Sequence, residues 1–304
     1  MLRTFQDPPR VAALILNWRQ PELTLQSLSD LRECGYPNLD ILVMDNGSGD
    51  DSVERLRTAR AEVMAFDDNL GYCAAMNLGI EWAQRRAADL VLFLNNDVRL
   101  PAGFLDPMVE VMARDSSVAC VGPTMLRPDG LVWCQGGAIA FHPNMLKLRG
   151  EGGPPAPSSE GPVAVDFMPG ACALYRLDEV VAVGGLDESY FMYWEDVELG
   201  WQLRDRGKTI VWLPWSRVTH LVSQSSGGGR SPVRKYMCAV NSVRYLKRHG
   251  TVRQWFAFAV FELVLWPFTW LGGTAPKAMF AKGRGLAAGL LGRRVTAADV
   301  RSAT

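Results

Sequence analysis

The amino-acid sequence predicts an α/β protein with a mostly parallel central sheet flanked by helices. Over the first hundred residues, short apolar runs alternate with amphipathic stretches of about a dozen residues. This alternation is typical of βαβ units, whose strands lie parallel in one sheet. The hydrophobic content, 48% of 304 residues, is enough to bury a large core. Several apolar runs also end in Asn or Asp, as expected where a ligand binds at the carboxyl edge of an α/β sheet.

The elements of the amino-terminal part follow from these patterns. The strand at 90–94 is apolar throughout and is therefore expected to be buried on both faces. Asp50 and Asp51 are candidates to cap the second helix. The predicted strands are residues 11–16, 40–44, 63–66 and 90–94, and the predicted helices are residues 21–33, 52–60 and 72–86.

The regular alternation ends after residue 100. Residues 150–162 consist almost entirely of Gly, Pro, Ser and Glu, which predicts a loop. Residues 131–142 are strand-like but contain a pair of glycines. The other predicted strands are residues 118–122, 163–167 and 209–213, and the predicted helices are residues 104–113, 177–183 and 195–206.

The net charge of zero hides an uneven distribution. Residues 1–226 contain 19 Lys and Arg against 30 Asp and Glu, whereas residues 227–304 contain 13 against only two. A basic segment of this kind favours an anionic surface, either membrane lipid or nucleic acid. Its charges alternate with long apolar runs, which favours an anionic membrane surface and argues against nucleic acid.

Residues 255–271 are nearly all apolar and predict a helix in a basic, apolar carboxyl-terminal extension. As one helix, these 17 residues would span about 25 Å, less than the roughly 30 Å hydrocarbon core of a bilayer. Glu262 and Pro267 also disfavour a spanning helix, so we expect it to lie in the membrane interface. The alternative is that it simply caps the core of the domain.

Six cysteines are scattered without any C-x-x-C spacing, which argues against a zinc site. The first ten residues are polar and contain prolines, unlike a signal peptide. We therefore expect reduced, mostly buried thiols in a cytoplasmic protein.

Polar side chains at the ends of the predicted strands are the first candidates for a site. Asp97, in Asn95-Asn96-Asp97, directly follows the strand at 90–94, and Asp45 follows the strand at 40–44. Acidic groups at neighbouring strand ends would flank one crevice, where a carboxylate can hold a divalent cation against a phosphate-bearing ligand. The ordinary alternative for both is a polar turn.

Two further candidates lie in the second half of the chain. Glu195 and Asp196 follow the aromatic cluster 190–194, which would shield them partly from water and raise the carboxylate pKa, as a general base requires. They also begin a predicted helix, where negative charge is favourable. His220 leads into the Gly/Ser run 223–230, which would close over phosphates with Arg230 as a counter-charge.

The order of these motifs resembles that of the inverting glycosyltransferases of family 2. ILNW, VMDNGSGD, DNLGYCAAMNLGI, FLNND, GGLDESYFMYWEDVELGWQLRDRG and TH…SSGGG follow one another in the family's order over about residues 10–250. The closest likeness is the rhamnosyltransferase-like branch of bacterial surface polysaccharide synthesis. The resemblance implies a GT-A fold, with a nucleotide-sugar-binding half (1–125), an acceptor-binding half (126–250) and a carboxyl-terminal extension (251–304).

The resemblance also implies roles for individual residues. Asp196 matches the catalytic base, with Glu195 beside it. Asp97 falls where the family binds Mg²⁺ or Mn²⁺, and His220 matches a histidine that helps hold the metal and diphosphate in some members. The sequence has Asn-Asn-Asp at 95–97 where a fuller acidic triplet is expected, so only one carboxylate of this motif is left for the metal.

Other positions are implied to bind the nucleotide sugar. Asp45 looks like the contact to the base, and Asn95 and Asn96 occupy the positions that reach the ribose. Arg204 matches an arginine that contacts a phosphate or supports the helix. The remaining positions assigned to the donor are Asn17, Asn69 and Arg230.

The expected function is therefore inverting transfer of a sugar, with rhamnose as one candidate, from a nucleoside diphosphate to a saccharide or lipid-linked saccharide. The protein is expected on the inner face of the cytoplasmic membrane. A nucleotidyltransferase would need a Gly-rich loop after the first strand, where residues 17–21 contain no glycine. The alternative from another class is a non-catalytic nucleotide-sugar-binding partner in a membrane polysaccharide assembly complex.

Overall fold

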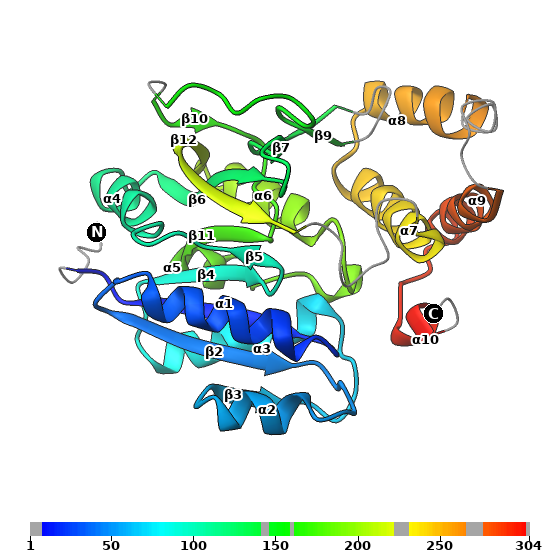
Figure 1. Cartoon of the computed structure of the whole chain (residues 1–304). Coiled ribbons are helices and arrows are strands. Elements are labelled where there is room, and N and C mark those ends of the chain that lie inside the picture. The colour runs from blue at the N-terminus through cyan, green and yellow to red at the C-terminus, as the bar shows by residue number, and fades with distance from the viewer. Residues whose placement is uncertain (1–7, 141–145, 159–160, 222–230, 266–275, 302–304) are drawn as a thin grey trace.

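A computed structural model describes residues 8–140, 146–158, 161–221, 231–265 and 276–301. In this part of the chain, ten strands form the main sheet, in which the long strands have the order β12-β6-β11-β4-β1-β2. Helices cover both faces of the sheet (Figure 1). The predicted α/β class with a mostly parallel sheet is confirmed.

The amino-terminal half follows the predicted alternation closely. β1 pairs in parallel with both β2 and β4, and β2 pairs in parallel with β3. Because such crossovers are right-handed, α1 and α3 cover opposite faces of the sheet. The bounds are β1 Val11–Asn17, α1 Pro21–Glu33, β2 Leu39–Asp45, α2 Ser52–Thr58, β3 Glu62–Ala65, α3 Tyr72–Arg85 and β4 Leu90–Asn95.

The second half extends the same sheet. β11 (Cys172–Arg176) runs antiparallel between β4 and β6 (Val118–Leu126), and β12 (Thr209–His220) pairs in parallel with β6. The six strands β1–β4, β6 and β12 therefore point the same way, toward α7 in Figure 1. The helices of this half are α4 Asp106–Arg114, α5 Leu177–Ala182, the 3₁₀ turn Glu188–Tyr190 and α6 Glu195–Asp205.

Four predicted strands differ from those observed, and the one expected at 118–122 continues to Leu126. The strand expected at 209–213 continues to His220, through a register shift between Leu213 and Arg217. The strand-like stretch 131–142 is divided into β7 (Val132–Cys134) and β8 (Gly137–Ile139), because Gly136 lies between them with a φ of 79°. Of 163–167, only β10 (Val163–Ala164) is strand, pairing with β12 at the edge of the sheet.

Short strands complete the region around the sheet edge. β5 (Val98–Arg99) pairs antiparallel with the end of β12, and β8 pairs with β9 (Leu146–Leu148) in a separate small sheet.

The side chain of Asp50, rather than that of Asp51, accepts a hydrogen bond at the start of α2, from the Ser52 amide at 2.9 Å.

The core lies where the central strands meet the covering helices. Residues 11–15 of β1 and 90–92 of β4 are fully buried, as the apolar runs predict. All six cysteines carry free thiols, and five of them are buried. Burial raises the pKa of the Cys172 thiol to about 12, which keeps it protonated at neutral pH.

The carboxyl-terminal segment is helical, as predicted for residues 251–304 but not for the helix that precedes them, and part of it packs onto the body of the protein. It consists of α7 Pro232–His249, α8 Val252–Phe258, a π-helical turn Ala259–Val264, α9 Pro276–Leu290 and α10 Ala297–Arg301. Two glycines of α9 allow a close approach to α7: a Cβ at Gly285 would lie 2.4 Å from the Tyr236 carbonyl oxygen, and one at Gly289 would lie 2.8 Å from Val243 Cβ.

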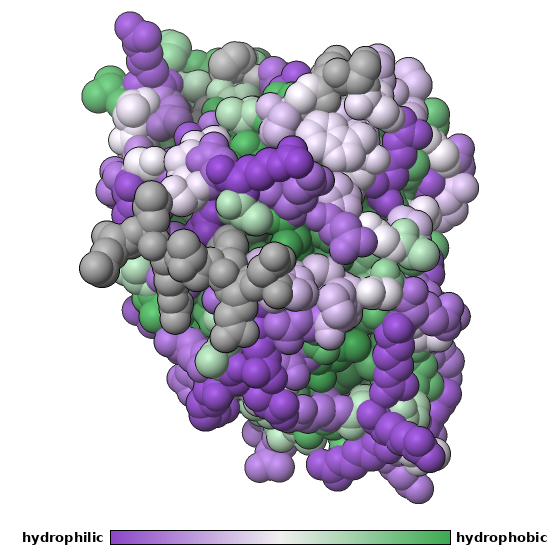
Figure 2. Space-filling model, turned by 90° about the vertical axis from the view of Figure 1, so that its left-hand side faces the viewer, coloured by the Kyte–Doolittle hydropathy of each residue, from purple (hydrophilic) through white to green (hydrophobic). Residues whose placement is uncertain are grey.

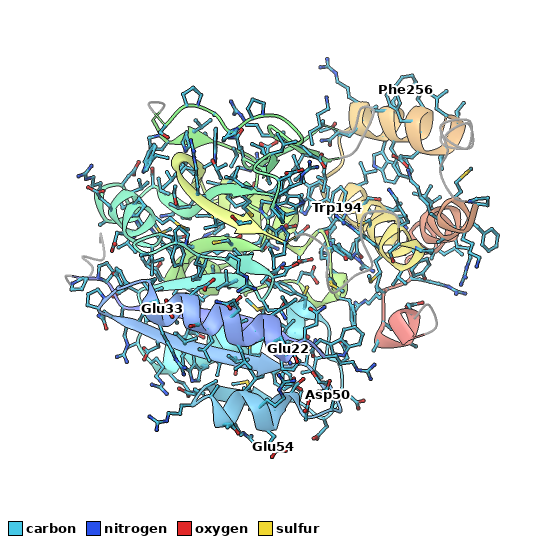
Figure 3. The ribbon with its side chains drawn as sticks, in the orientation of Figure 1. Glu22, Glu33, Asp50, Glu54, Trp194 and Phe256 are labelled. Atoms are coloured by element: carbon cyan, nitrogen blue, oxygen red, sulfur yellow. The ribbon has the colours of Figure 1, made fainter. Side chains whose placement is uncertain are left out.

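α8 has one buried and one exposed face. Phe258 is 1% exposed and belongs to the main core, whereas Phe256 is 73% exposed and lies on the outer side of the helix (Figure 3). Glu262 is buried and forms an ion pair with Lys282 of α9. The predicted stretch 255–271 therefore caps the core with one face, while residues 266–271 lie outside the described part. None of the described helices is both long and apolar enough to cross a bilayer.

Candidate active site

A cavity of about 460 Å³ opens at the carboxyl ends of the parallel strands. Its walls come from the ends of β4 and β12, from the segment 191–196 and from the first turns of α7. The topology therefore brings Asp97, Asp196 and His220 to one cavity, although they are far apart in the sequence. The predicted residues that line it are Asn69, Asn95, Asn96, Asp97, Glu195, Asp196 and His220.

Asp97 and His220 are in direct contact at the floor of the cavity. Asp97 Oδ1 lies 3.1 Å from His220 Nε2, and both side chains are about 95% buried. The antiparallel pairing of β5 with β12 places His220 opposite Val98, next to this carboxylate. Trp133 packs edge-on against the imidazole, with 4.3 Å between ring centroids. His220 Nδ1 is buried and has no hydrogen-bond partner among the described residues.

Asn95 and Asn96 end β4 above the start of α1. The Asn96 side-chain amide donates to Thr24 Oγ1 at 3.1 Å, and the backbone carbonyl oxygen of Asn96 accepts from Ser27 Oγ at 2.8 Å. These bonds tie the Asn95-Asn96-Asp97 turn to α1. The turn is thus both a structural feature and part of the cavity wall.

Glu195 and Asp196 begin α6 and line the opposite side of the cavity. Asp196 accepts hydrogen bonds from the amides of Val197 (2.8 Å) and Gly170 (3.4 Å), while Glu195 Oε2 is buried and has no partner among the described residues. Burial raises the pKa of Asp196 to about 6, and the two amide donors limit that rise. Burial, and then the charge of Asp196, raise the pKa of Glu195 well above its usual value.

The acid pair follows a turn with unusual backbone geometry. Phe191, Tyr193 and Trp194 have φ values of 60°, 69° and 75°, in the left-handed region that non-glycine residues avoid. Each such residue costs about 1–2 kcal/mol, so the surrounding structure must hold the turn in place. The turn lies between α3 and α7, and Trp194 is seen there between the main sheet and α7 (Figure 3).

The predicted donor residues divide into two groups. Asn69 lines the cavity, and its side-chain oxygen accepts from the Gly71 amide at 2.9 Å. Asn17 and Asp45 are almost fully buried at the ends of β1 and β2, joined by a 2.7 Å hydrogen bond from Asn17 Nδ2 to Asp45 Oδ2. Ser48 donates both its amide (3.0 Å) and its hydroxyl (2.6 Å) to the same carboxylate. Asn17 and Asp45 lie outside the cavity lining, so their contact with the nucleotide stays a prediction.

Of the two predicted arginines, Arg204 does not line the cavity, and Arg230 lies outside the described residues. Arg204, near the end of α6, donates to Asp166 Oδ1 at 2.9 Å. Of the two roles expected for it, this favours support of the helix over a phosphate contact. Arg230 and the rest of the run 223–230 lie outside the described residues.

Sequence reasoning missed several residues of the cavity wall. Asn46 directly follows Asp45 in the same motif, and that position could have been included. Nothing in the sequence around Trp133 indicates that it belongs to the cavity, because a strand-like segment does not show which distant residue its side chains will contact. Arg234, on the first turn of α7, lies with its guanidinium 5.4 Å from the Tyr193 ring centroid. That helix was not predicted at all.

Within the described ranges, no three His, Cys, Asp or Glu side chains cluster as a metal-binding group. Asp97 and His220 supply one carboxylate and one imidazole, which fits a cation that also binds substrate phosphates. A metal held here would therefore need the substrate to complete its ligands.

Residues 15–178 match glycosyl transferase family 2, which is more than half of the chain. The chain belongs to glycosyltransferase family 2. It is 31% identical over 213 residues to N-acetylglucosaminyl-diphospho-decaprenol L-rhamnosyltransferase of Mycobacterium tuberculosis, covering 62% of this chain and 68% of that protein. It is 27% identical over 256 residues to an O-antigen biosynthesis protein of Myxococcus xanthus, covering 78% of this chain but only 19% of that longer protein.

Solved structures confirm the GT-A fold. A mannosyltransferase from Pyrobaculum calidifontis, in complex with GDP-Man and Mn²⁺, superposes with a TM-score of 0.62 at 17% identity, covering 97% of this chain and 79% of that one. A GalNAc-T7 structure with UDP, GalNAc and Mn²⁺ superposes with a TM-score of 0.60 at 14% identity, covering 87% and 59%. The family, the fold and the glycosyltransferase class expected from the motifs are thus confirmed.

The partly buried charge of Asp196 should lower the stability of the protein at neutral pH. A pKa raised from 3.8 to about 6 corresponds to about 3 kcal/mol at a pH where both folded and unfolded states are ionised. Asp196→Asn should therefore raise the free energy of unfolding by about 1–3 kcal/mol at pH 8. The gain should shrink as the pH falls through 6 toward 4, because the folded wild type then becomes protonated.

Urea denaturation at pH 8 and pH 5 measures this difference. The matched control is Asp205→Asn, which changes an exposed acid of the same helix and should leave stability nearly unchanged. Equal stability of wild type and Asp196→Asn at pH 8 would show that the carboxylate is not under strain from burial.

Proposed function

We propose that this glycosyltransferase moves a sugar from a nucleoside diphosphate to a saccharide or lipid-linked saccharide by a single inverting displacement. The observation that supports this most directly is that Asp97 and Asp196 line one cavity from different walls. One wall is suited to the charged leaving group and the other to a general base, as such a displacement requires.

In this proposal Asp196 is the base. Its pKa of about 6 leaves it ionised at neutral pH and still basic enough to accept a proton. It takes the proton of the acceptor hydroxyl as that oxygen attacks the anomeric carbon. The bond from that carbon to the diphosphate oxygen breaks in the same step, and the configuration inverts. Burial disfavours the charged form of Glu195 beside it, which limits the negative charge on the acceptor side.

The donor would lie against the carboxyl ends of β1, β2 and β4. Asn69 and Asn95 line the cavity there, with the Asn17–Asp45 pair buried close by at the strand ends. Asp97 and His220 are the residues that would hold Mg²⁺ or Mn²⁺. Such a cation would offset the negative charge of the diphosphate. Because the described part of the chain offers only two such ligands, we expect metal affinity to depend strongly on bound donor.

The relatives support rhamnose as the first sugar to test. One relative is named as an L-rhamnosyltransferase acting on a diphospho-decaprenol-linked acceptor, and the structural neighbours were solved with GDP-Man or UDP and with Mn²⁺. We therefore propose dTDP-rhamnose as the first donor and a polyprenyl diphosphate-linked saccharide as the acceptor class.

Two substitutions test the division of roles across the cavity. Asp196→Asn should keep donor affinity within about twofold and lower turnover by about 10²–10⁴-fold, the usual contribution of a general base. Asp97→Asn should weaken metal-dependent donor binding as well. Released nucleoside diphosphate reports turnover, in a screen of dTDP-, UDP- and GDP-sugars with Mg²⁺ or Mn²⁺, and calorimetry reports binding.

The same pair distinguishes the enzyme from a non-catalytic nucleotide-sugar-binding partner. A binding partner would show donor affinity without any turnover in the wild type. Full turnover by Asp196→Asn would refute the role proposed for this carboxylate.

We also propose that the carboxyl-terminal helices rest on the cytoplasmic face of an anionic membrane. Among the described residues, the large exposed apolar side chains concentrate there: Val252, Phe256, Leu263, Val264, Leu265, Phe280, Leu290 and Leu291, against Leu70 and Val181 elsewhere. Exposed cations lie on the same helices, including Arg253, Lys277 and Arg284. The face at the opposite, amino ends of the strands is mostly hydrophilic (Figure 2). Apolar groups mixed with cations favour the interface of an anionic bilayer.

Co-sedimentation with vesicles tests this surface. The protein should bind phosphatidylglycerol vesicles at low salt, and both Phe256→Ser and Phe280→Ser should weaken binding several-fold. Phosphatidylcholine vesicles should bind less, since the cations then lack a partner. Val181→Ser, on exposed α5, is the control and should bind like the wild type. Unchanged binding of the Phe256 and Phe280 variants would show that these helices do not contact lipid.

A further inference from the structure

Asn241 is a fully buried polar residue in the middle of α7 that lies outside the cavity. Its side-chain amide nitrogen lies 2.8 Å from the carbonyl oxygen of Tyr190, 2.9 Å from that of Met192 and 2.8 Å from that of Tyr193. An amide has only two hydrogens, so at least one is shared between two acceptors. All three acceptors belong to the turn that precedes Glu195 and Asp196.

The two remaining carbonyls of this turn are held by other helices. The Phe191 oxygen accepts from the amides of Tyr72 (2.7 Å) and Cys73 (3.2 Å), in the first turn of α3. The Trp194 oxygen accepts from the Glu198 amide at 2.9 Å, within α6. Five consecutive carbonyls, 190–194, are therefore fixed by three different helices, and three of these residues have positive φ.

We propose that Asn241 is a positioning residue for sugar transfer, which holds the 190–194 turn so that the Asp196 carboxylate points into the cavity. The inference rests on the proposed role of Asp196. Because Asp196 follows the turn by two residues, a change in the path of residues 193–194 rotates the start of α6. Such a rotation would shift the carboxylate relative to Gly170, the residue at the cavity wall whose amide donates a hydrogen bond to it.

The contacts of Asn241 separate this role from general stabilisation of α7. Its amide nitrogen bonds only to the turn, and its side-chain oxygen has no partner among the described atoms. The next residue, Ser242, is equally buried, but its hydroxyl donates to the Ala239 carbonyl within α7 at 2.9 Å. Ser242→Ala therefore removes a buried polar group from the same turn of the same helix without touching the 190–194 turn.

Asn241→Ala and Asn241→Asp are the test variants. Asp keeps the shape but turns an acceptor oxygen toward three carbonyl oxygens, so its effect should equal or exceed that of Ala. With dTDP-rhamnose and Mn²⁺, or with the donor that the wild type turns over, kcat should fall at least tenfold while donor Kd stays within twofold. Asn241→Ser, which retains one donor, should lie between Ala and the wild type and is the milder change to the fold.

Hydrogen exchange of residues 188–198 gives a readout that does not depend on the donor. These amides should exchange faster in Asn241→Ala and in Asn241→Ser, and at the wild-type rate in Ser242→Ala. Thermal unfolding of all variants separates a loss of stability from a loss of turnover.

Several outcomes would overturn the inference. One is kcat within twofold of the wild type in Asn241→Ala or Asn241→Ser; another is a parallel loss of kcat and donor affinity matched by Ser242→Ala. Unchanged exchange of residues 188–198 would also refute it. If instead Asp196→Asn keeps full turnover, the proposed base is wrong, whatever Asn241 does.

Discussion

The structure of the site depends on keeping two acidic side chains next to each other at the start of α6, Glu195 buried and Asp196 partly buried. Burying Glu195 and Asp196 is unfavourable, and the cost appears in the raised pKa of both groups. Two features offset part of it: the amide donors to Asp196, and the positive end of the helix that the pair begins. The strained turn before them adds to the cost, so α3 and α7 must hold it. As a result, the Asp196 carboxylate is ionised at neutral pH yet more basic than that of an exposed aspartate.

The sheet topology explains how distant residues meet at this cavity. β12 extends past the end of β6 and pairs with β5. This pairing brings His220 next to Asp97, although the two residues are 123 positions apart in the sequence. The helix that follows, α7, lines the cavity with its first turns and contacts the 190–194 turn through Asn241. Its other side receives α9 through Gly285 and Gly289. The proposed membrane-facing helices are therefore connected to the acid pair through one helix.

The sequence was most informative where the pattern is local. The apolar runs at 11–16 and 90–94 predict the central strands because such strands are buried on both faces, and the polar residues that end them lie at the edge that carries the cavity. Asp97, Asp196 and His220 were identified together through the order of motifs, and the structure brings them to one cavity. Asn17 and Asp45 also lie at strand ends, but their side chains bond to each other beneath the surface. Position at a strand end does not determine whether a side chain faces the cavity or the core.

The rest depends on tertiary contacts that leave no local signal. β11, in Cys-Ala-Leu-Tyr-Arg, is short and contains Cys and Ala, so it does not stand out as a central strand, yet it joins the two halves of the sheet. Asn241 lies within a basic amphipathic helix, where an asparagine is usually a surface residue. Only the packed structure reveals three carbonyl oxygens opposite its amide. The same applies to Trp133, whose contact with His220 follows from the division of residues 131–142 at Gly136.

The pH dependence of kcat for the wild-type protein tests the central claim most directly. A base that must be ionised loses activity as it becomes protonated, and burial raises the pKa of Asp196 to about 6. With saturating donor and metal, kcat should therefore fall on the acid side with an apparent pKa near 6. A kcat that stays constant down to about pH 4.5, as for a carboxylate of ordinary pKa near 4, would contradict the account.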